Sequence, residues 1–434
     1  MKTEFTPQQL ADPATATSEK AIRTCVHCGF CTATCPTYVL LGDERDSPRG
    51  RIWLIKDMLE KSATPTPEVV THIDRCLSCL ACETTCPSGV SYRRLVDHAR
   101  AYIEDKHKRP LIERLLRSGL AKTMPNRDRF AAALSLGRFA SPLAGLFKTL
   151  GAKRIAAALR LAANNPAHSP QIDASPATAA RKGRVLLQAG CAEPVLRPQY
   201  QAATARLLNR LGYDVVRAPA DQCCGSLTHH MGREHDALRS VRQTIDAWTP
   251  EIENGVDAII FTVTGCGTTL KDYGFLMRNE PTYAARAARI SALAKDITEF
   301  VPPSSITPGA AKLRVAYHPA CSLQHGQKIT TQPKALLQAA GFTVVTPANA
   351  HLCCGSAGTY NILQPKIADQ LGDRKTASLE ALKPDIIATG NIGCAVQIAA
   401  RTGTPVVHVA ELLDWATGGP KPAALKQINF KTET

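Results

Sequence analysis

Two cysteine runs with the same spacing constrain this 434-residue chain more than any other feature. The first, CVHCGFCTATCP, spans residues 25–36, and the second, CLSCLACETTCP, spans residues 76–87. Each follows the pattern C-x2-C-x2-C-x3-C-P. Three thiolates spaced in this way converge on one iron–sulfur cube, because the loop between them wraps it, whereas the fourth cysteine points toward a second cube. The duplicated spacing therefore predicts a region built around two [4Fe–4S] clusters.

In this arrangement each cluster takes three cysteines from one run and the fourth from the other. The predicted sets are Cys25, Cys28, Cys31 and Cys86 for the first cluster and Cys76, Cys79, Cys82 and Cys35 for the second. The alternative is zinc, which prefers four thiolates from two separated C-x2-C knuckles, so a repeated four-cysteine run fits it poorly. His27 and His72 lie nearby, and we interpret them as surface residues or as supports of the ligands.

The residues between the two runs have helical spacing. Ser47 is a good N-cap and Pro48 suits the first helical position. An apolar stripe follows at Ile52, Ile55, Met58 and Leu59. The stretch before Cys76 is also helical in spacing. Cysteine runs joined by helices predict the α-helical type of two-cluster ferredoxin domain rather than the compact β-hairpin type.

The second half of the chain is a tandem repeat. RVLLQAGC at 184–191 resembles RVAYHPAC at 314–321, and DQCCGS resembles HLCCGS. The remaining cysteines map onto one another, with the first three shifted by 130 residues and the last by 128. They are Cys191, Cys223, Cys224 and Cys266 in the first copy, and Cys321, Cys353, Cys354 and Cys394 in the second.

Each copy alternates predicted strands with helices, which indicates a parallel sheet. The first and last cysteines of a copy fall at the carboxyl ends of strands, where ligands bind in such sheets, so all four can converge on one site. Thiolates select soft metals, which makes a further cluster or zinc plausible. A vicinal disulfide and buried inert thiols are the alternatives.

The excess positive charge is concentrated between these two parts. The whole chain has a net charge of +15, and residues 88–184 carry 19 Lys and Arg against six Asp and Glu. Residues 93–163 have helical spacing, and residues 164–183 have the composition of a linker. Basic amphipathic helices bind anionic membrane surfaces. A plain helical connector, or a docking face for an acidic partner subunit, explains the same pattern.

Several classes of protein are excluded by the same composition. The N-terminus lacks the apolar segment of a secretory signal, and no apolar stretch reaches the roughly 18 residues of a membrane span. Clustered thiols without an export signal indicate a reducing compartment. Nearly all of the excess charge lies in one segment and no nucleic-acid-binding motif is present, so nucleic acid is not an expected partner.

Taken together, these stretches resemble one family, the iron–sulfur subunits of glycolate oxidase (glycolate dehydrogenase). CVHCGFCTATCPTYVLLGDERDSPRGRIWLIK, CLSCLACETTCPSGV, GCGTTLKDYG, HLCCGSAGTY and NIGCAVQ carry the resemblance, which covers essentially the whole chain. Related cysteine-rich repeats often end in C-x-x-C. Here those positions read Cys266-Gly-Thr-Thr269 and Cys394-Ala-Val-Gln397, which puts a non-cubane cluster of the heterodisulfide reductase type in doubt.

The resemblance implies an α+β multidomain chain that passes electrons from a partner flavoprotein, which oxidises glycolate to glyoxylate, toward a quinone. The chain lacks a G-x-G-x-x-G fingerprint, so FAD is expected on the partner. Equivalent subunits acting on D-lactate or glycerol 3-phosphate are the alternatives, as is a cluster-bearing regulator or scaffold without turnover. Localisation is expected to be cytoplasmic, peripheral at the inner face of the membrane. The expected domains are a ferredoxin domain at 1–100, a basic helical segment and linker at 101–182, and cysteine-rich repeats at 183–309 and 310–434.

Overall fold

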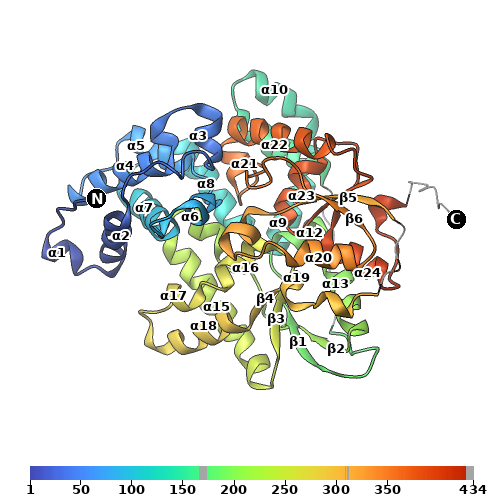
Figure 1. Ribbon diagram of the computed structural model, residues 1–434. Coiled ribbons are helices and arrows are strands. Elements are labelled where there is room, and N and C mark those ends of the chain that lie inside the picture. The colour runs from blue at the N-terminus through green and yellow to red at the C-terminus, as the bar shows by residue number, and fades with distance from the viewer. Residues whose placement is uncertain (166–173, 308, 310–311, 427–434) are drawn as a thin grey trace.

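The computed structural model describes residues 1–165, 174–307, 309 and 312–426. A helical N-terminal region lies beside two α/β units that follow one another in the chain (Figure 1). This combination of a helical region and two parallel-sheet repeats confirms the predicted fold class. The predicted linker at 164–183 falls partly on residues 166–173, which lie outside the described residues.

The N-terminal region is built from helices around one apolar core. Its helices are α1 (Pro7–Leu10), α2 (Pro13–Thr24), α3 (Pro36–Leu41), α4 (Pro48–Glu60), α5 (Pro67–Asp74), α6 (Ala81–Thr85) and α7 (Tyr92–Lys106). Helix α4 begins as predicted, because the Ser47 hydroxyl accepts a hydrogen bond of 3.0 Å from the Gly50 N–H. Ile52 and Ile55 on α4 pack against Leu95 of α7 in that core. Cys25, Cys76 and Cys82 belong to the same core, so the helices fix both cysteine runs.

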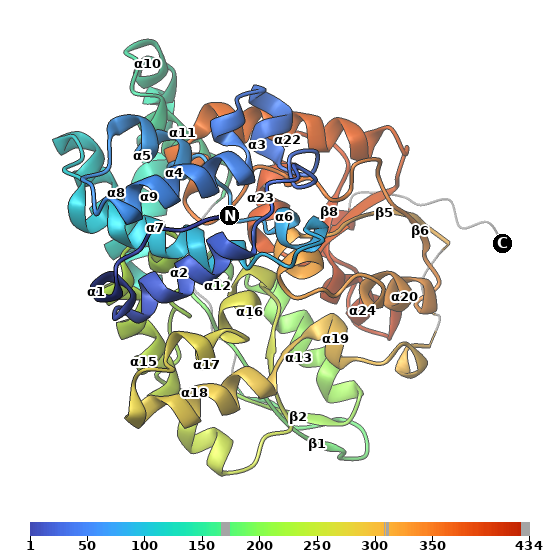
Figure 2. The same ribbon diagram turned by 60° about the vertical axis from the view of Figure 1, so that its left-hand side comes forward.

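Four further helices connect this region to the repeats. They are α8 (Leu111–Thr123), α9 (Arg127–Phe139), α10 (Ala144–Thr149) and α11 (Lys153–Asn164). Phe130 and Leu134 of α9 are buried against Val195 and Leu196 of the first repeat and Ile392 of the second. Helix α10 projects from the body of the molecule (Figure 2). Among the described residues, no single helix is long and apolar enough to cross a membrane, and α9 passes that test only together with residues 141–149, across a bend of 61°.

Each repeat contains a four-stranded parallel sheet. The first has the order β2-β1-β3-β4 and the second the order β6-β5-β7-β8. The strands are β1 (Gly183–Leu187), β2 (Tyr213–Val216), β3 (Ala258–Phe261), β4 (Ala294–Asp296), β5 (Arg314–His318), β6 (Thr343–Val345), β7 (Ile386–Thr389) and β8 (Val406–His408). The sequence predicted three strands in each copy. Strands β4 and β8 escaped prediction because three-residue strands carry too little alternation to be recognised on their own. Strand β6 is equally short but was predicted from its match to β2 in the repeat.

The helices of the first repeat are α12 (Ala192–Leu196), α13 (Gln199–Arg210), α14 (Ser226–His230), α15 (Glu234–Glu253), α16 (Thr264–Leu270), α17 (Tyr273–Leu276), α18 (Pro281–Leu293) and α19 (Ile297–Phe300). Those of the second are α20 (Gln332–Ala339), α21 (Tyr360–Leu363), α22 (Pro365–Glu380), α23 (Ile392–Ala399) and α24 (Val409–Ala416). Short 3-10 turns at 44–46, 141–143, 303–305 and 423–425 and a π-helical turn at 322–326 complete the chain.

The two repeats share one core, and equivalent pairs of helices pack against each other across their interface. Helix α13 of the first repeat packs on α24 of the second, and α19 of the first packs on α20 of the second. Arg206 and Arg210 of α13 both pair with the buried carboxylate of Asp414 on α24. Leu187 and Tyr317, one from each sheet, belong to the same buried cluster. The repeats are therefore fixed relative to one another, which also fixes their cysteines.

Candidate metal centres

The first predicted cysteine set lines one cavity. Cys25, Cys28 and Cys31 from the first run meet Cys86 from the second run there. Cys28 is exposed, whereas Cys25 is buried. This cavity therefore lies close to the surface of the N-terminal region.

The second predicted set lines a neighbouring cavity. Its wall includes Cys35, Cys76, Cys79 and Cys82. Cys82 also borders the first cavity, so the two cavities adjoin. The fold therefore brings together the cysteines of each predicted set, in which the fourth cysteine comes from the other run. The assignment of each cysteine to a cluster remains a prediction.

The backbone turns in the same way in both runs. His27 and Gly29 have φ angles of 59° and 84°, and the equivalent Ser78 and Leu80 have φ angles of 50° and 61°. The Ser78 N–H donates a hydrogen bond of 3.4 Å to the sulfur of Cys76. Left-handed conformations cost a non-glycine residue about 1 kcal/mol or more, and successive turns of this kind form concavities that bind anions. The strained loops therefore suit the binding of an anionic cluster.

Burial makes these thiols poor acids when no metal is bound. It raises the pKa of Cys31 to about 11 and raises the pKa of Cys79 and Cys82 well above the ordinary value. A metal centre binds thiolates and displaces the thiol protons. Eight cysteines converge on two adjoining cavities, and [4Fe–4S] clusters take cysteine thiolates as ligands. The donor set therefore fits two such clusters.

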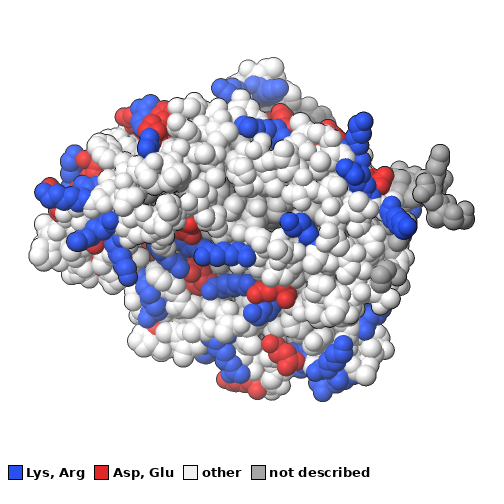
Figure 3. Space-filling view, viewed as in Figure 1, with Lys and Arg blue, Asp and Glu red and all other residues white. Residues whose placement is uncertain are grey.

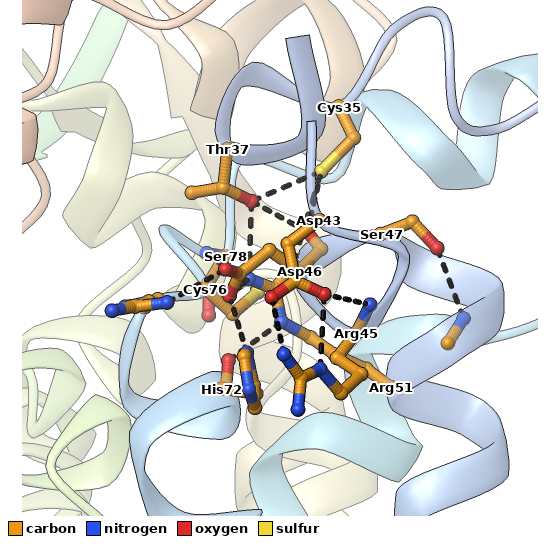
Figure 4. A network of polar contacts seen from close by, with 12 residues as sticks. Cys35, Thr37, Asp43, Arg45, Asp46, Ser47, Arg51, His72, Cys76 and Ser78 are labelled. Atoms are coloured by element: carbon orange, nitrogen blue, oxygen red, sulfur yellow. Dashed lines mark hydrogen bonds and ion pairs between the residues drawn. The ribbon is translucent and has the colours of Figure 1, made fainter. Parts of the chain in front are cut away.

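A buried polar network supports the second set (Figure 4). Asp46 is fully buried and accepts hydrogen bonds from Arg51 at 3.2 Å, His72 Nδ1 at 2.9 Å and Arg75 at 2.8 Å. Arg51 also donates to Thr37 Oγ1 at 3.0 Å. His72 is thus buried behind the ligands rather than at the surface.

Sequence reasoning missed Asp46 and Arg51 as parts of the site. The sequence did contain one signal for this network, because Arg51 lies directly beside the apolar stripe of α4. A cation buried at such a position needs a specific anionic partner. The partner carboxylate comes from the short turn at 44–46, which sequence alone does not place. Burial lowers the pKa of Arg51, but Cys76, Tyr92, Cys35 and Asp46 raise it above its ordinary value.

The cysteines of the two repeats surround one larger cavity of about 210 Å³. It lies where both sheets present the carboxyl ends of their strands. Seven of the eight repeat cysteines line it, namely Cys191, Cys223, Cys224, Cys266, Cys321, Cys353 and Cys394. Cys354 is fully buried behind it, with its sulfur 3.3 Å from that of Cys394. The expected convergence within each copy is therefore observed, and the two sets also face each other.

The glycine after each cysteine pair is required by the turn. Gly225 and Gly355 have φ angles of 85° and 86°. A Cβ atom at Gly355 would lie 2.5 Å from the carbonyl oxygen of Ala368, and one at Gly225 would lie 2.9 Å from that of Ala237. Both the left-handed backbone and the close approach exclude a side chain.

The second ferredoxin-type set lies beside the second repeat. Leu77, between Cys76 and Ser78, packs in one buried cluster with Cys321 and Cys353. Leu77 and Cys79 also line the large cavity. Thr84 and His325 Nδ1 form a hydrogen bond of 2.7 Å at the same boundary. The order in space is therefore the first set, the second set and then the repeat cysteines.

One further residue near the repeat cysteines was missed by sequence reasoning. His318 ends strand β5 and is fully buried, and one of its ring nitrogens lies within 4.8 Å of the sulfurs of Cys354 and Cys394. The first repeat has Gln188 in the equivalent position. A histidine in one copy where the other has glutamine was the signal in the sequence that could have identified His318.

Comparison with known protein families assigns the N-terminal region and the two repeats to different domain families. Residues 21–90 match a 4Fe-4S dicluster domain, and residues 185–271 and 315–399 each match a cysteine-rich domain. The chain is 42% identical to the glycolate oxidase iron-sulfur subunit of Escherichia coli K12, over 96% of this chain and 99% of the relative. It is 31% identical to a probable glycolate oxidase iron-sulfur subunit of Bacillus subtilis, over 92% of this chain and 95% of the relative.

Relatives of a second kind match only about half of the chain. The lactate utilization protein A of Geobacillus kaustophilus is 29% identical over 53% of this chain and 98% of its own length. Among solved structures, a hypothetical protein from Helicobacter pylori has a TM-score of 0.54 at 9% identity, covering 95% of this chain and 74% of that one. This last likeness concerns the fold alone.

Proposed function

The chain belongs to the family of glycolate oxidase iron–sulfur subunits, and on this premise we propose that it is the electron-transfer subunit of a glycolate-oxidising complex. One observation carries the proposal: eight cysteines line two adjoining cavities, and the second cavity lies against the cysteines of the repeats. When bound, the two clusters supply one-electron transfer. Cys25, Cys28, Cys31 and Cys86 would hold one, and Cys76, Cys79, Cys82 and Cys35 the other.

We propose a direction for the electron transfer from the exposure of the residues around each cysteine set. Cys28 is exposed, and the neighbouring Val26 and Phe30 are 67% and 65% exposed. Exposed apolar residues around a redox site form a surface for a partner protein. We therefore place the docking of the flavoprotein here. The second set and Leu77 lie deeper and lead toward the repeats.

Oxidation of the substrate belongs to the partner in this proposal. The chain has no G-x-G-x-x-G fingerprint after a strand, so FAD is assigned to the flavoprotein subunit. Hydride chemistry is supplied by the flavin, and one-electron carriers then remove its electrons singly. A quinone is the proposed final acceptor. D-lactate is the second candidate substrate, because the lactate utilization relatives match half of this chain.

Peripheral contact with the membrane is proposed for the helices between the two parts. Nine of the fourteen exposed large apolar side chains among the described residues lie between residues 111 and 155. Phe139 is 93% exposed and Leu150 is 70% exposed. Basic side chains exposed in the same segment are Arg114, Lys122, Arg129, Arg138, Lys148 and Lys153. Lys and Arg are also visible beside α10 in Figure 3. Apolar residues flanked by cations suit the inner, anionic face of the cytoplasmic membrane.

The proposal is tested by separating flavin reduction from electron transfer. In the complex with Cys28→Ser, glycolate should still reduce the flavin in a single turnover, whereas steady-state quinone reduction should fall at least about tenfold because the flavin cannot discharge. Ser62→Ala, an exposed change away from the cysteines, is the control. Flavin content is measured in parallel, since loss of a cluster can unfold its domain. If flavin is retained but glycolate no longer reduces it, the chain takes part in substrate oxidation and the proposal fails.

A substrate screen distinguishes the candidates. Glycolate, D-lactate and glycerol 3-phosphate are compared by kcat/KM with the same purified complex. Glycolate should give the highest value. A preference for D-lactate or glycerol 3-phosphate would overturn the substrate while leaving the electron-transfer role intact.

A further inference from the structure

His318 is a buried histidine whose ring lacks the usual partners. Its exposure is 0%, and neither ring nitrogen makes a hydrogen bond of good geometry, although the Cys354 thiol lies against the ring. Buried polar groups are nearly always hydrogen-bonded, so an unpaired imidazole needs a specific explanation. Neutral imidazole is also the commonest metal ligand in proteins.

The ring lies beside two of the second repeat's cysteines. One of its nitrogens and the sulfurs of Cys354 and Cys394 all lie within 4.8 Å of one another, and all three residues are buried. The two sulfurs are 3.3 Å apart. Cys353 is also in contact with Cys354, so a third thiol adjoins the group. Three donors of two types therefore meet at one point, and the Cys353 thiol adjoins them through Cys354.

Neighbouring groups are arranged to support thiolates at this point. The Asn391 side-chain amide donates to the sulfur of Cys394 at 3.5 Å, and the Gly355 N–H donates to that of Cys353 at 3.4 Å. Hydrogen bonds to coordinating sulfur atoms commonly orient and stabilise them. The Lys375 ammonium, which donates to the Asn349 carbonyl at 3.0 Å, adds a positive charge to the neighbourhood.

The close spacing fits one ion better than a cube. Zinc binds sulfur at about 2.3 Å and nitrogen at about 2.0 Å, so the ligands of one tetrahedral ion lie about 3–4 Å apart. A [4Fe–4S] cluster instead holds its cysteine sulfurs on different irons and needs them spread around the cube. Mixed imidazole and thiolate ligands are typical of zinc.

The first repeat is built differently at this point. Gln188 replaces the histidine, and its amide nitrogen has no hydrogen-bond partner. Within the described residues, Cys191, Cys223, Cys224 and Cys266 form no equally compact group of three donors. An amide side chain is a poor ligand for zinc, so the two repeats are not equivalent.

We propose that the second repeat binds one Zn²⁺ ion through His318, Cys354, Cys394 and Cys353, and that the first repeat lacks this site. The ion would tie strand β5, the CCG turn and helix α23 together beside the second ferredoxin-type set. Zinc carries no redox chemistry, so this site would serve the structure of the repeat and not electron transfer. The inference is independent of the substrate of the complex.

The test uses the full chain with its clusters, purified anaerobically, and Zn²⁺ itself as the probe. Metal analysis should give about one zinc per chain in addition to the cluster iron. X-ray absorption at the zinc edge should show one nitrogen at about 2.0 Å and three sulfurs at about 2.3 Å. Four sulfurs without nitrogen, extra iron in the repeats in place of zinc, or no zinc uptake on titration would each overturn the proposal.

Two substitutions isolate the contribution of the imidazole. His318→Gln installs the residue that the first repeat tolerates at this position, and it should weaken zinc binding more than about 100-fold, since even outer partners of a ligand contribute 10–100-fold. His325→Gln is the matched control, because His325 is equally part of the second repeat but is hydrogen-bonded to Thr84 and to the His351 carbonyl. Cluster iron should be unchanged in both variants. Unchanged zinc affinity in His318→Gln, or equal losses in the two variants, would show that His318 is not a ligand.

Discussion

The guanidinium of Arg51 lies 3.8 Å from the sulfur of Cys35, and both residues are buried. Asp46 neutralises this cation within the same network, so the charge is held without solvent (Figure 4). Hydrogen bonds and charge near the sulfurs are principal determinants of cluster potential. We therefore expect Arg51 to raise the reduction potential of the cluster proposed at this site.

Arg51→Met should make this cluster harder to reduce. Loss of the nearby positive charge lowers its reduction potential. The buried Asp46 carboxylate loses one of its three partners, which costs about 1.5–3 kcal/mol of folding stability. Redox titration followed by electron paramagnetic resonance measures the potential, and chemical denaturation measures the stability. Arg23→Met removes an exposed pair with Glu19 and should change stability by no more than about 1 kcal/mol. An unchanged potential in Arg51→Met would show that this cation does not act on the cluster.

Phe139→Ser combined with Leu150→Ser should release the protein from anionic vesicles. Each side chain contributes about 1.5–3 kcal/mol when it is buried in an apolar phase, so affinity should fall at least about tenfold per residue. Binding of the unmodified protein should also weaken with salt, because screening shortens electrostatic attraction. Vesicle flotation measures both effects. Trp53→Ser, which changes an exposed apolar residue outside this segment, should leave binding intact. Flotation that is absent or insensitive to salt would favour docking to a partner subunit instead.

Gly355→Ala should destabilise the second repeat by more than about 2 kcal/mol. The substitution combines a left-handed backbone with a Cβ atom 2.5 Å from the carbonyl oxygen of Ala368, which cannot move away easily. Gly265→Ala is the control, because this glycine precedes Cys266 in helix α16, has no neighbour within 4 Å of the added Cβ, and does not need a positive φ. It should be neutral or slightly stabilising. Thermal unfolding of both variants checks the contrast, and similar losses would contradict the steric explanation.

The ion pair between Asp97 of α7 and His229 of the first repeat should make the folding stability of the protein depend on pH. Burial lowers the pKa of His229, but Asp97, 3.2 Å away, together with Asp272 and Glu234 raises it above 6.5. Burial raises the pKa of Asp97, but His229 and His230 lower it well below 3.8. The stabilising charge pair is therefore fully present between pH 3.8 and 6.5. It is lost as pH rises through the folded pKa of His229, and also as pH falls through that of Asp97.

Asp97→Asn measures this contribution. Unfolding of the metal-loaded chain is followed by fluorescence as pH rises from 6 to 9, and the unmodified protein should lose more stability over this range than the variant. Asp105→Asn, an exposed carboxylate on the same helix, is the control and should follow the unmodified protein. Parallel pH profiles for Asp97→Asn and the unmodified protein would exclude the pair as the cause.

Local signals in the sequence were sufficient for much of the architecture. The capping pattern of Ser47 and Pro48 predicted the start of α4 correctly, because capping depends on neighbours in the chain. The spacing of the cysteine runs and the tandem repeat predicted the helical region and the parallel sheets for the same reason. Strands β4 and β8 were missed, since short strands are stabilised by the sheet that they join rather than by their own pattern.

The sequence by itself predicted the cysteines as candidate ligands, because cysteine spacing is a local property that a loop around a cluster requires. Only the tertiary structure decided what lies next to them. Asp46 reaches Arg51 from a separate turn, Leu77 meets Cys321 across two parts of the chain, and His318 meets Cys394 across neighbouring strands. Such contacts depend on how helices and sheets pack, and packing buries side chains far apart in sequence without leaving a pattern that local spacing reveals.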